Sequence, residues 1–167
     1  MDILPPALIA QATFTTIDMV MSRYPVSDEA KQRLKPNMSP EQGVAVLQQD
    51  GLERDAIQLT AHFLPVMPCI RWGYNQISGR EGLPDDQQHL VELVSQWLAS
   101  PNETIRIRLQ QLADRTGLDN SCAWLAYAVF WCGTGSIVAP DLPVVLPPDN
   151  MVGHAVNAAI LLYLCGM

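Results

Sequence analysis

Hydrophobic positions recur along most of this chain at the spacing of an α-helix. Leu90, Val94, Trp97 and Leu98 follow the i, i+4, i+7, i+8 pattern, which places them on one helical face. Residues 52–63 and 105–112 carry similar stripes. No segment keeps the alternation of period two that is typical of a half-buried strand. The pattern therefore predicts an all-α protein.

Residues that begin or end helices separate these segments. Ser39-Pro40-Glu41-Gln42 and Ser100-Pro101-Asn102-Glu103 both fit a capping box with proline near the first helical position. Gly117 is a natural helix stop. The predicted helices cover approximately residues 13–24, 27–35, 39–50, 52–64, 68–78, 84–98, 100–116, 121–132 and 149–164. The first is expected to begin at Thr13 or Thr16, and the last at Asp149 or Asn150.

Every residue from Cys122 to Cys132 is apolar or aromatic. A helix that is apolar all round is covered on several sides, so we expect this one at the centre of a bundle. Asp119 or Ser121 is expected to cap it. Residues 133–148, called here the Pro-rich loop, contain too much proline and glycine to be helical.

The whole chain, residues 1–167, fits a single helical domain. The expected architecture is a bundle of eight or nine short helices around the helix from Cys122 to Cys132, with the Pro-rich loop before the last helix. Residues 1–12 are expected to form a flexible end.

Charge and hydropathy exclude some classes of function. The net charge of −7 argues against nucleic-acid binding, which needs clustered basic residues. Arg106 and Arg108 are the closest basic pair, and we expect them on a solvated helix face. The N-terminus lacks a signal-peptide pattern. The last apolar run is interrupted by His154 and Asn157 and is shorter than the ~20 residues of a membrane span. The sequence predicts a cytoplasmic protein without membrane insertion.

Candidate chemistry is sparse. No two of the three histidines stand at metal-ligand spacing, and the four cysteines form no C-x-x-C pair. We expect no metal, no cofactor and no enzymatic activity. A cysteine-dependent hydrolase would need Cys69, Cys122 or Cys132 beside a histidine, and the apolar neighbours of these cysteines do not favour a reactive thiolate.

Two features indicate a protein-binding surface. Arg71, Trp72 and Tyr74 belong to the residue types that are enriched at interfaces, although core packing explains a tryptophan equally well. The Pro-rich loop carries several large aliphatic residues and one charge, Asp141. It either lies across the core or forms an exposed apolar patch. Its candidate contacts are Ile137, Val138, Leu142, Val144, Val145 and Leu146.

Several packing residues and helix stops resemble an uncharacterised family of small bacterial proteins associated with type VI secretion gene clusters. The resemblance is carried by Tyr24-Pro25-Val26-Ser27-Asp28-Glu29-Ala30, Leu34-x-Pro36, Ala61-His62-Phe63-Leu64-Pro65, Arg71-Trp72, Trp97, Pro101, Trp124, Phe130-Trp131, Pro147-Pro148, Ala155-Val156 and Ala158-Ala159. Members look like accessory proteins that work beside an effector chaperone and a PAAR-type spike tip. The resemblance implies a non-enzymatic adaptor or co-chaperone whose partner is an effector chaperone, an effector or a spike-tip protein.

Two other functions stay open at this point. An immunity protein that neutralises a toxin from the same cluster would use an acidic surface against a basic toxin, which the net charge fits. A cysteine-dependent hydrolase is the third hypothesis. Self-association through the same apolar surface is also open.

Overall fold

The computed structural model describes Leu4, Ile9, Ala12 and residues 14–167. Within these residues it contains nine α-helices and no strand, which confirms the all-α prediction. Most of the predicted flexible end, residues 1–12, lies outside the described residues, as does Thr13. The helices are α2 Asp18–Met21, α3 Asp28–Arg33, α4 Pro40–Gln49, α5 Glu53–Phe63, α6 Val66–Ile77, α7 Asp85–Ala99, α8 Glu103–Thr116, α9 Ser121–Phe130 and α10 Met151–Leu164.

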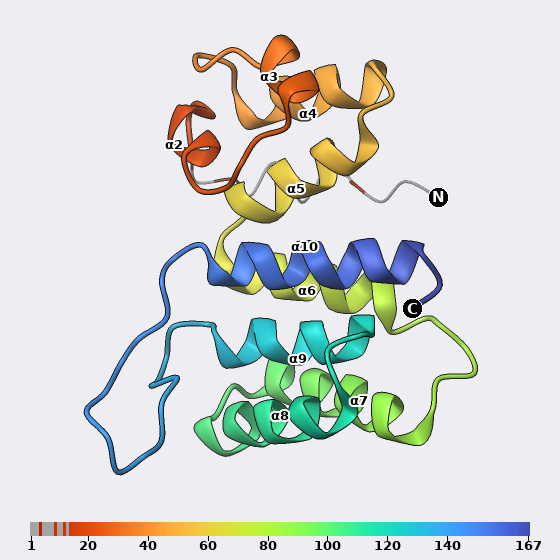
Figure 1. Cartoon of the computed structure of the whole chain (residues 1–167), viewed down its shortest axis with the longest axis vertical. Coiled ribbons are helices and arrows are strands. Elements are labelled where there is room, and N and C mark those ends of the chain that lie inside the picture. Colours follow the sequence, from red (N-terminus) through yellow and green to blue (C-terminus); the bar gives the residue numbers. More distant parts are fainter. Residues whose placement is uncertain (1–3, 5–8, 10–11, 13) are drawn as a thin grey trace.

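The helices pack in layers around one hydrophobic core. Helix α10 lies beside α6 in the middle of the molecule, with α9 on one side and α5 on the other (Figure 1). Helices α7 and α8 form the layer beyond α9, and α2, α3 and α4 gather around α5. Leu125 of α9 and Val156 of α10 are fully buried. The predicted central helix is therefore confirmed, and α10 shares its position.

Helix α9 is not covered on every side. Trp124 and Tyr127 are only half-buried. The Tyr127 hydroxyl donates a hydrogen bond to the Asp114 carboxylate, which is exposed to solvent. Tyr127 and Trp131 lie 5.0 Å apart between ring centroids. Side chains that are apolar in body and polar at the tip suit such a half-covered face.

Side-chain caps begin four of the nine described helices, and two of these four caps come from other residues than the predicted ones. Ser39 and Gln42 form the predicted capping box. The second predicted box is wrong, because Asn102 and not Ser100 is the N-cap of α8, with its Oδ1 accepting from the Ile105 N–H at 2.9 Å. Ser100 instead ends α7. Asn120 caps α9 in place of Asp119 or Ser121. Asparagine is as favourable at the N-cap as serine or aspartate. A nearby serine or aspartate therefore does not determine which residue caps the helix.

Two further boundaries differ from the prediction. Helix α6 begins at Val66, directly after Pro65, so Pro68 lies inside its first turn; proline is tolerated there because the N–H groups of a first turn have no partner within the helix. Helix α2 is a single turn, Asp18–Met21. None of the described helices has the length and apolarity needed to cross a membrane.

The position of the α8 cap can be tested by two alanine substitutions. We expect Asn102→Ala to lower the free energy of unfolding by about 1 kcal/mol, because the Ile105 N–H loses its acceptor. Ser100→Ala is the matched control and should change stability by less than about 0.5 kcal/mol. Urea denaturation of both variants measures the difference. A larger loss for Ser100→Ala would contradict the cap seen here.

Candidate protein-binding site at the Pro-rich loop

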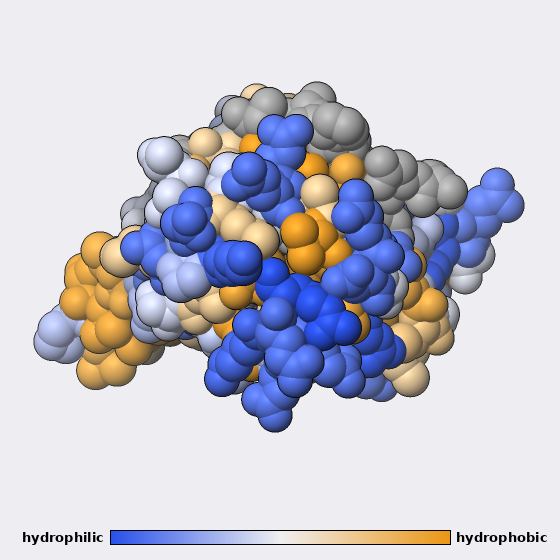
Figure 2. All heavy atoms as spheres, turned by 90° about the horizontal axis from the view of Figure 1, so that it is seen from above, coloured by the Kyte–Doolittle hydropathy of each residue, from blue (hydrophilic) through white to orange (hydrophobic). Residues whose placement is uncertain are grey.

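The Pro-rich loop projects from the end of the bundle where α9 stops and α10 begins (Figure 1). Four of its large aliphatic side chains are exposed: Leu142 by 53%, Val144 by 74%, Val145 by 46% and Leu146 by 57%. We call these four residues the loop tip. In Figure 2 an orange apolar lobe projects at the left, on the side where Figure 1 places the loop. The loop tip therefore does not lie across the core, whereas Ile137 and Val138 are half-buried.

Hydrogen bonds between the two limbs of the loop give it a defined shape. The Ile137 N–H donates to the Val145 carbonyl at 2.9 Å. The Ser136 hydroxyl accepts from the N–H groups of Val138 at 3.3 Å and Val145 at 3.1 Å. Prolines on both limbs restrict the backbone further. A partner that docks on this loop would therefore order little new chain.

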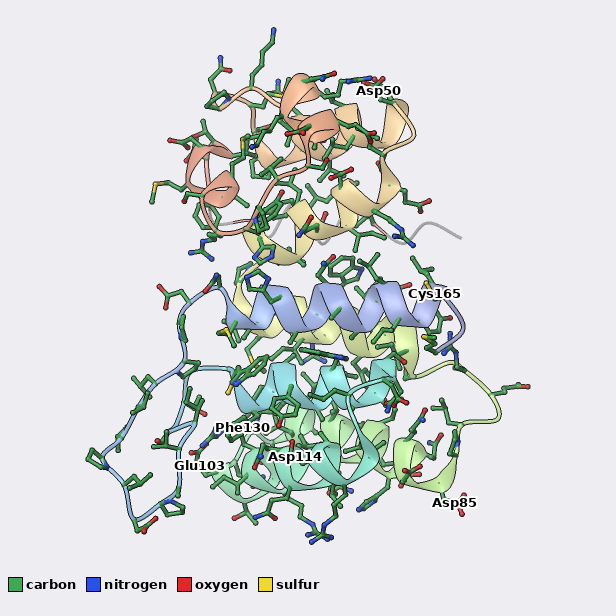
Figure 3. The ribbon with its side chains drawn as sticks, viewed as in Figure 1. Asp50, Asp85, Glu103, Asp114, Phe130 and Cys165 are labelled. Atoms are coloured by element: carbon green, nitrogen blue, oxygen red, sulfur yellow. The ribbon has the colours of Figure 1, made fainter. Side chains whose placement is uncertain are left out.

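Arg106 fastens the base of the loop to the bundle. Its guanidinium donates to the Phe130 carbonyl at 2.7 Å and to the Ser136 carbonyl at 3.1 Å. It also forms a two-pronged contact with Glu103, at 2.7 and 2.9 Å. Figure 3 shows Glu103 and Phe130 on the side of the bundle next to the loop. The expectation of a solvated face is wrong for Arg106, which is 1% exposed, because the carbonyls of the loop base and of the end of α9 need a donor.

Glu103 completes this fastening. Its carboxylate accepts from the Thr134 hydroxyl at 3.0 Å, so it bridges α8 and the loop. The hydrogen bonds from Arg106, followed by that from Thr134, lower the pKa of Glu103 against the effect of desolvation. A Cβ at Gly135 would overlap both the Glu103 carboxylate and the Arg106 guanidinium, so this close approach requires glycine.

A pocket of about 250 Å³ lies beneath the loop, and we call it the loop-base pocket. Its walls come from the segments before and after α2, the junction of α5 and α6, the end of α9, the two ends of the loop and the start of α10. The residues around it are Phe14, Arg23, Ala61, His62, Leu64, Pro65, Val66, Trp131, Cys132, Gly133, Pro147, Pro148, Asp149, Asn150, Val152 and Gly153.

His62 is the buried polar group of this pocket. It is 1% exposed, stacks on Tyr24 at 4.6 Å and meets the edge of His154 at 4.8 Å. Neither ring nitrogen has a hydrogen-bond partner among the described residues. Burial, followed by the charges of His154 and Arg23, lowers the pKa of His62 to about 3. The ring is therefore uncharged at neutral pH. It lies against α10 because position 153 is glycine, where a Cβ would be 2.5 Å from Nδ1.

The structure does not assemble a cysteine–histidine pair among the described residues. Cys132 borders the same pocket as His62, but its sulfur lies 3.3 Å from the Thr134 hydroxyl and the His62 nitrogens are unbonded. The Cys69 thiol donates to the Ala61 carbonyl, and burial raises its pKa. Burial also raises the pKa of Cys122. The described residues contain no group of three His, Cys, Asp or Glu side chains that could hold a metal ion.

The other predicted contacts lie on α6. Trp72 is fully buried in the core, so its assignment as a surface contact is wrong: packing determines its position. Arg71 is exposed and Tyr74 is half-buried. Neither residue borders the loop-base pocket. The structure therefore does not bring Arg71 and Tyr74 into one site with the loop.

Comparison with known families adds one finding. The model of a family of unknown function (DUF6931) matches residues 43–166. The chain belongs to this family. No curated protein and no solved structure matches the chain. The DUF6931 match covers α5 to α10, including the Pro-rich loop, Glu103 and Arg106, but Arg23 lies outside it.

Proposed function

We propose that this DUF6931 protein is a non-enzymatic adaptor that binds another protein through the loop tip. The observation that carries the proposal is the exposure of four large aliphatic side chains on a loop that Arg106 and Ser136 hold in shape. Complete burial of one valine or leucine side chain contributes about 1.5–3 kcal/mol. A groove that covered the loop tip would gain several such contributions, while the cost of ordering the loop has already been met in folding.

The form of the loop tip indicates the kind of partner surface. Residues 143–148 run without helical structure, and side chains on both sides of Val144 and Val145 are exposed. An extended apolar segment with prolines at its ends suits an apolar groove, not a flat acidic or basic surface. The same groove could be offered by a second copy of this chain, which is one outcome of the experiment below.

The setting that we propose is type VI secretion, where the protein acts as a co-chaperone in loading an effector onto a spike tip. The resemblance described above supports this setting, and so does an accessible apolar loop without an assembled catalytic pair beside it. The proposed mechanism is mass action: the adaptor covers an apolar surface of the effector chaperone or the effector until another component displaces it. The compartment that we propose for this role is the cytoplasm.

The substitution Val145→Asp tests the loop tip. We expect it to abolish co-purification of the partner with the tagged protein from the native bacterium, because burying an unpaired carboxylate in an apolar groove is strongly unfavourable. The free energy of unfolding should change by less than about 0.5 kcal/mol, since this side chain is 46% exposed. Mass spectrometry of the eluate and size-exclusion chromatography measure the outcome. An effector chaperone, effector or spike-tip protein is the expected partner.

Met19→Asp is the matched control, because Met19 is an exposed apolar residue on α2, outside the loop (62% exposed). It should leave the complex intact. If Val145→Asp unfolds the protein, the loop belongs to the core and the proposal fails. If Val145→Asp keeps the partner, the interface lies elsewhere. A complex that contains only this chain would make the loop tip a self-association surface.

An immunity protein is the second candidate function, and the net charge of −7 favours it. Acidic inhibitors of basic toxins bind through long-range attraction, so their affinity falls steeply with added salt. Binding through an apolar loop should change little between 50 and 500 mM salt. Recovery of a toxin domain alone, with strongly salt-dependent binding, would favour the immunity function.

A further inference from the structure

The loop-base pocket is continuous with the proposed binding surface. Gly133, Pro147 and Pro148, at the two ends of the Pro-rich loop, form one of its sides. Arg23 and His62 also line the pocket. Because Pro147 directly follows Leu146 of the loop tip, a partner segment that covers the loop tip has this pocket next to it. Its volume of about 250 Å³ is smaller than the 300–1,000 Å³ of typical small-molecule sites and suits one or two side chains.

Arg23 brings to the pocket a positive charge that no described carboxylate neutralises. Its guanidinium lies 4.8 Å from the centroid of the Phe14 ring and makes a single long hydrogen bond, 3.5 Å, to the His62 carbonyl. Among the described residues the ion pairs are Arg33 with Asp50 and Arg106 with Glu103, so no described carboxylate pairs with Arg23. The guanidinium therefore keeps several donors for a ligand.

The backbone of Arg23 is held in place. The Asn150 side-chain amide donates to the Arg23 carbonyl at 3.1 Å and also lies 3.2 Å from His154 Nε2. This contact ties the segment after α2 to the start of α10. A half-buried cation on a fixed backbone is better prepared for a planar anion than a mobile surface lysine.

The rest of the pocket combines apolar walls with His62, a second polar group that lacks a partner. Val66, Trp131 and Val152 border the pocket. The His62 ring is 1% exposed, and both of its nitrogens lack a hydrogen-bond partner among the described residues. Such a wall favours a group that is apolar beside its charge over a fully hydrated ion.

We propose that the loop-base pocket binds a carboxylate of the partner protein together with an adjacent apolar side chain, and that the Arg23 guanidinium holds the carboxylate. The carboxylate is either a chain end or an acidic side chain. This inference rests on the proposed function, because it names the chemistry of the partner segment that reaches past the loop tip.

Neutralising Asp149 should change the affinity for a carboxylate in the opposite direction to neutralising Arg23. Asp149 is an exposed residue that borders the same pocket, and it makes no ion pair with Arg23. Its charge repels a bound carboxylate, so the pocket should hold such a group more tightly once Asp149 is neutral. The net charge of −7 adds a weaker repulsion of the same sign. The attraction must therefore be local to Arg23.

The test uses three synthetic peptides and the full chain. The peptides are acetyl-leucyl-leucine with a free carboxylate, the same peptide as its amide, and acetyl-leucyl-glutamyl-leucine amide. Binding is followed by two-dimensional NMR of ¹⁵N-labelled tryptophan indoles, because Trp131 borders the pocket while Trp72 and Trp97 are buried in the core. We expect at least one of the two peptides that carry a carboxylate to shift the Trp131 signal. Acetyl-leucyl-leucine amide, which carries no carboxylate, should bind at least tenfold more weakly than that peptide.

Four variants distinguish the pocket from the surrounding surface. Arg23→Gln should weaken the carboxylate peptide at least tenfold, and Asp149→Asn should strengthen it a few-fold. Val66→Trp should fill the pocket and block the peptide with Arg23 unchanged. Arg80→Gln is the matched control: Arg80 also lies over an aromatic ring, Tyr163 at 4.2 Å, but does not border the pocket. It should leave the affinity unchanged.

Several results would overturn the inference. One is equal affinity for acetyl-leucyl-leucine and for its amide, and a second is unchanged affinity for the carboxylate peptides in Arg23→Gln. A third is tighter binding of N-acetyl-leucine than of both carboxylate peptides, which would indicate a small-molecule site. The peptide assay does not require the loop partner. A failed peptide assay with Val145→Asp still abolishing the complex leaves the adaptor function standing. Intact peptide binding with no effect of Val145→Asp on the complex overturns the loop tip as the interface and leaves the carboxylate pocket standing.

Discussion

Replacing Arg106 by methionine is expected to lower the free energy of unfolding by about 2–4 kcal/mol. The side chain is 1% exposed and donates to the carbonyls of Phe130 and Ser136. Methionine would leave these acceptors without their donor, and each unsatisfied buried group costs about 1–3 kcal/mol. Glu103 adds little to the loss, because its side chain is 51% exposed and water can replace Arg106.

The position of Arg106 at the end of α9 adds to this effect. Phe130 is the last residue of α9, and its carbonyl belongs to the set that finds no partner inside the helix. A cation at a helix C-terminus also interacts favourably with the helix dipole. Arg106→Lys should therefore recover part of the loss: it keeps the charge but cannot reach both carbonyls and Glu103 in one planar geometry.

Arg108→Met is the matched control, because Arg108 lies two residues away on the same helix and is exposed. It should change stability by less than about 0.5 kcal/mol. Urea denaturation gives the free energies. Hydrogen exchange at the Ile137 and Val145 amides, which are bonded within the loop, should show lost protection only in Arg106→Met. Equal stability of the two methionine variants would contradict the role of Arg106 as the anchor of the loop.

The fold could be predicted from the sequence because its signals are local. Helical stripes such as Leu90 to Leu98, and stops such as Gly117, determine elements without reference to the rest of the chain. The boundaries that were wrong involve close competitors: Asn102 against Ser100, and Asn120 against Asp119 or Ser121. Each can accept from the first-turn amides, and only the backbone geometry selects one.

The candidate site could be predicted only in part. The sequence identified the Pro-rich loop as an apolar segment with one charge. The exposure of its side chains depends on where α9 ends and α10 begins. The role of Arg106 was not visible, since an E-x-x-R pair on a helix usually indicates a surface contact. The loop-base pocket joins residues near positions 23, 62 and 149. Their proximity is a property of the packing of α5 against α10 and has no local signal.

His62 should make the protein less stable as the pH falls. The unfolded chain protonates this histidine near pH 6.5, whereas burial, His154 and Arg23 lower the pKa in the folded state to about 3. Between these values the unfolded state binds more protons. The contribution of His62 to the free energy of unfolding is therefore fully present above pH 6.5. It is lost as the pH falls toward 3, by about 1.4 kcal/mol per pH unit. Between pH 7 and pH 5 the loss amounts to about 2 kcal/mol.

The substitution His62→Phe isolates this contribution. Phenylalanine keeps a planar ring for stacking on Tyr24 and removes the two unpartnered nitrogens, so stability at pH 7 should stay within about 1 kcal/mol of the original. The decline between pH 7 and pH 5, measured by urea denaturation, should be about 2 kcal/mol smaller in the variant. His89→Phe serves as the control, because His89 is exposed and should keep the original pH dependence. An identical decline in His62→Phe and the original protein would mean that folding does not lower the pKa of His62, so that the ring takes up a proton near pH 6.5 in the folded state as well. A protonated His62 would then add a second positive charge to that of Arg23 at the loop-base pocket, and binding of a carboxylate there would weaken above pH 6.5. With His62 uncharged, the positive charge that holds a carboxylate there comes from Arg23.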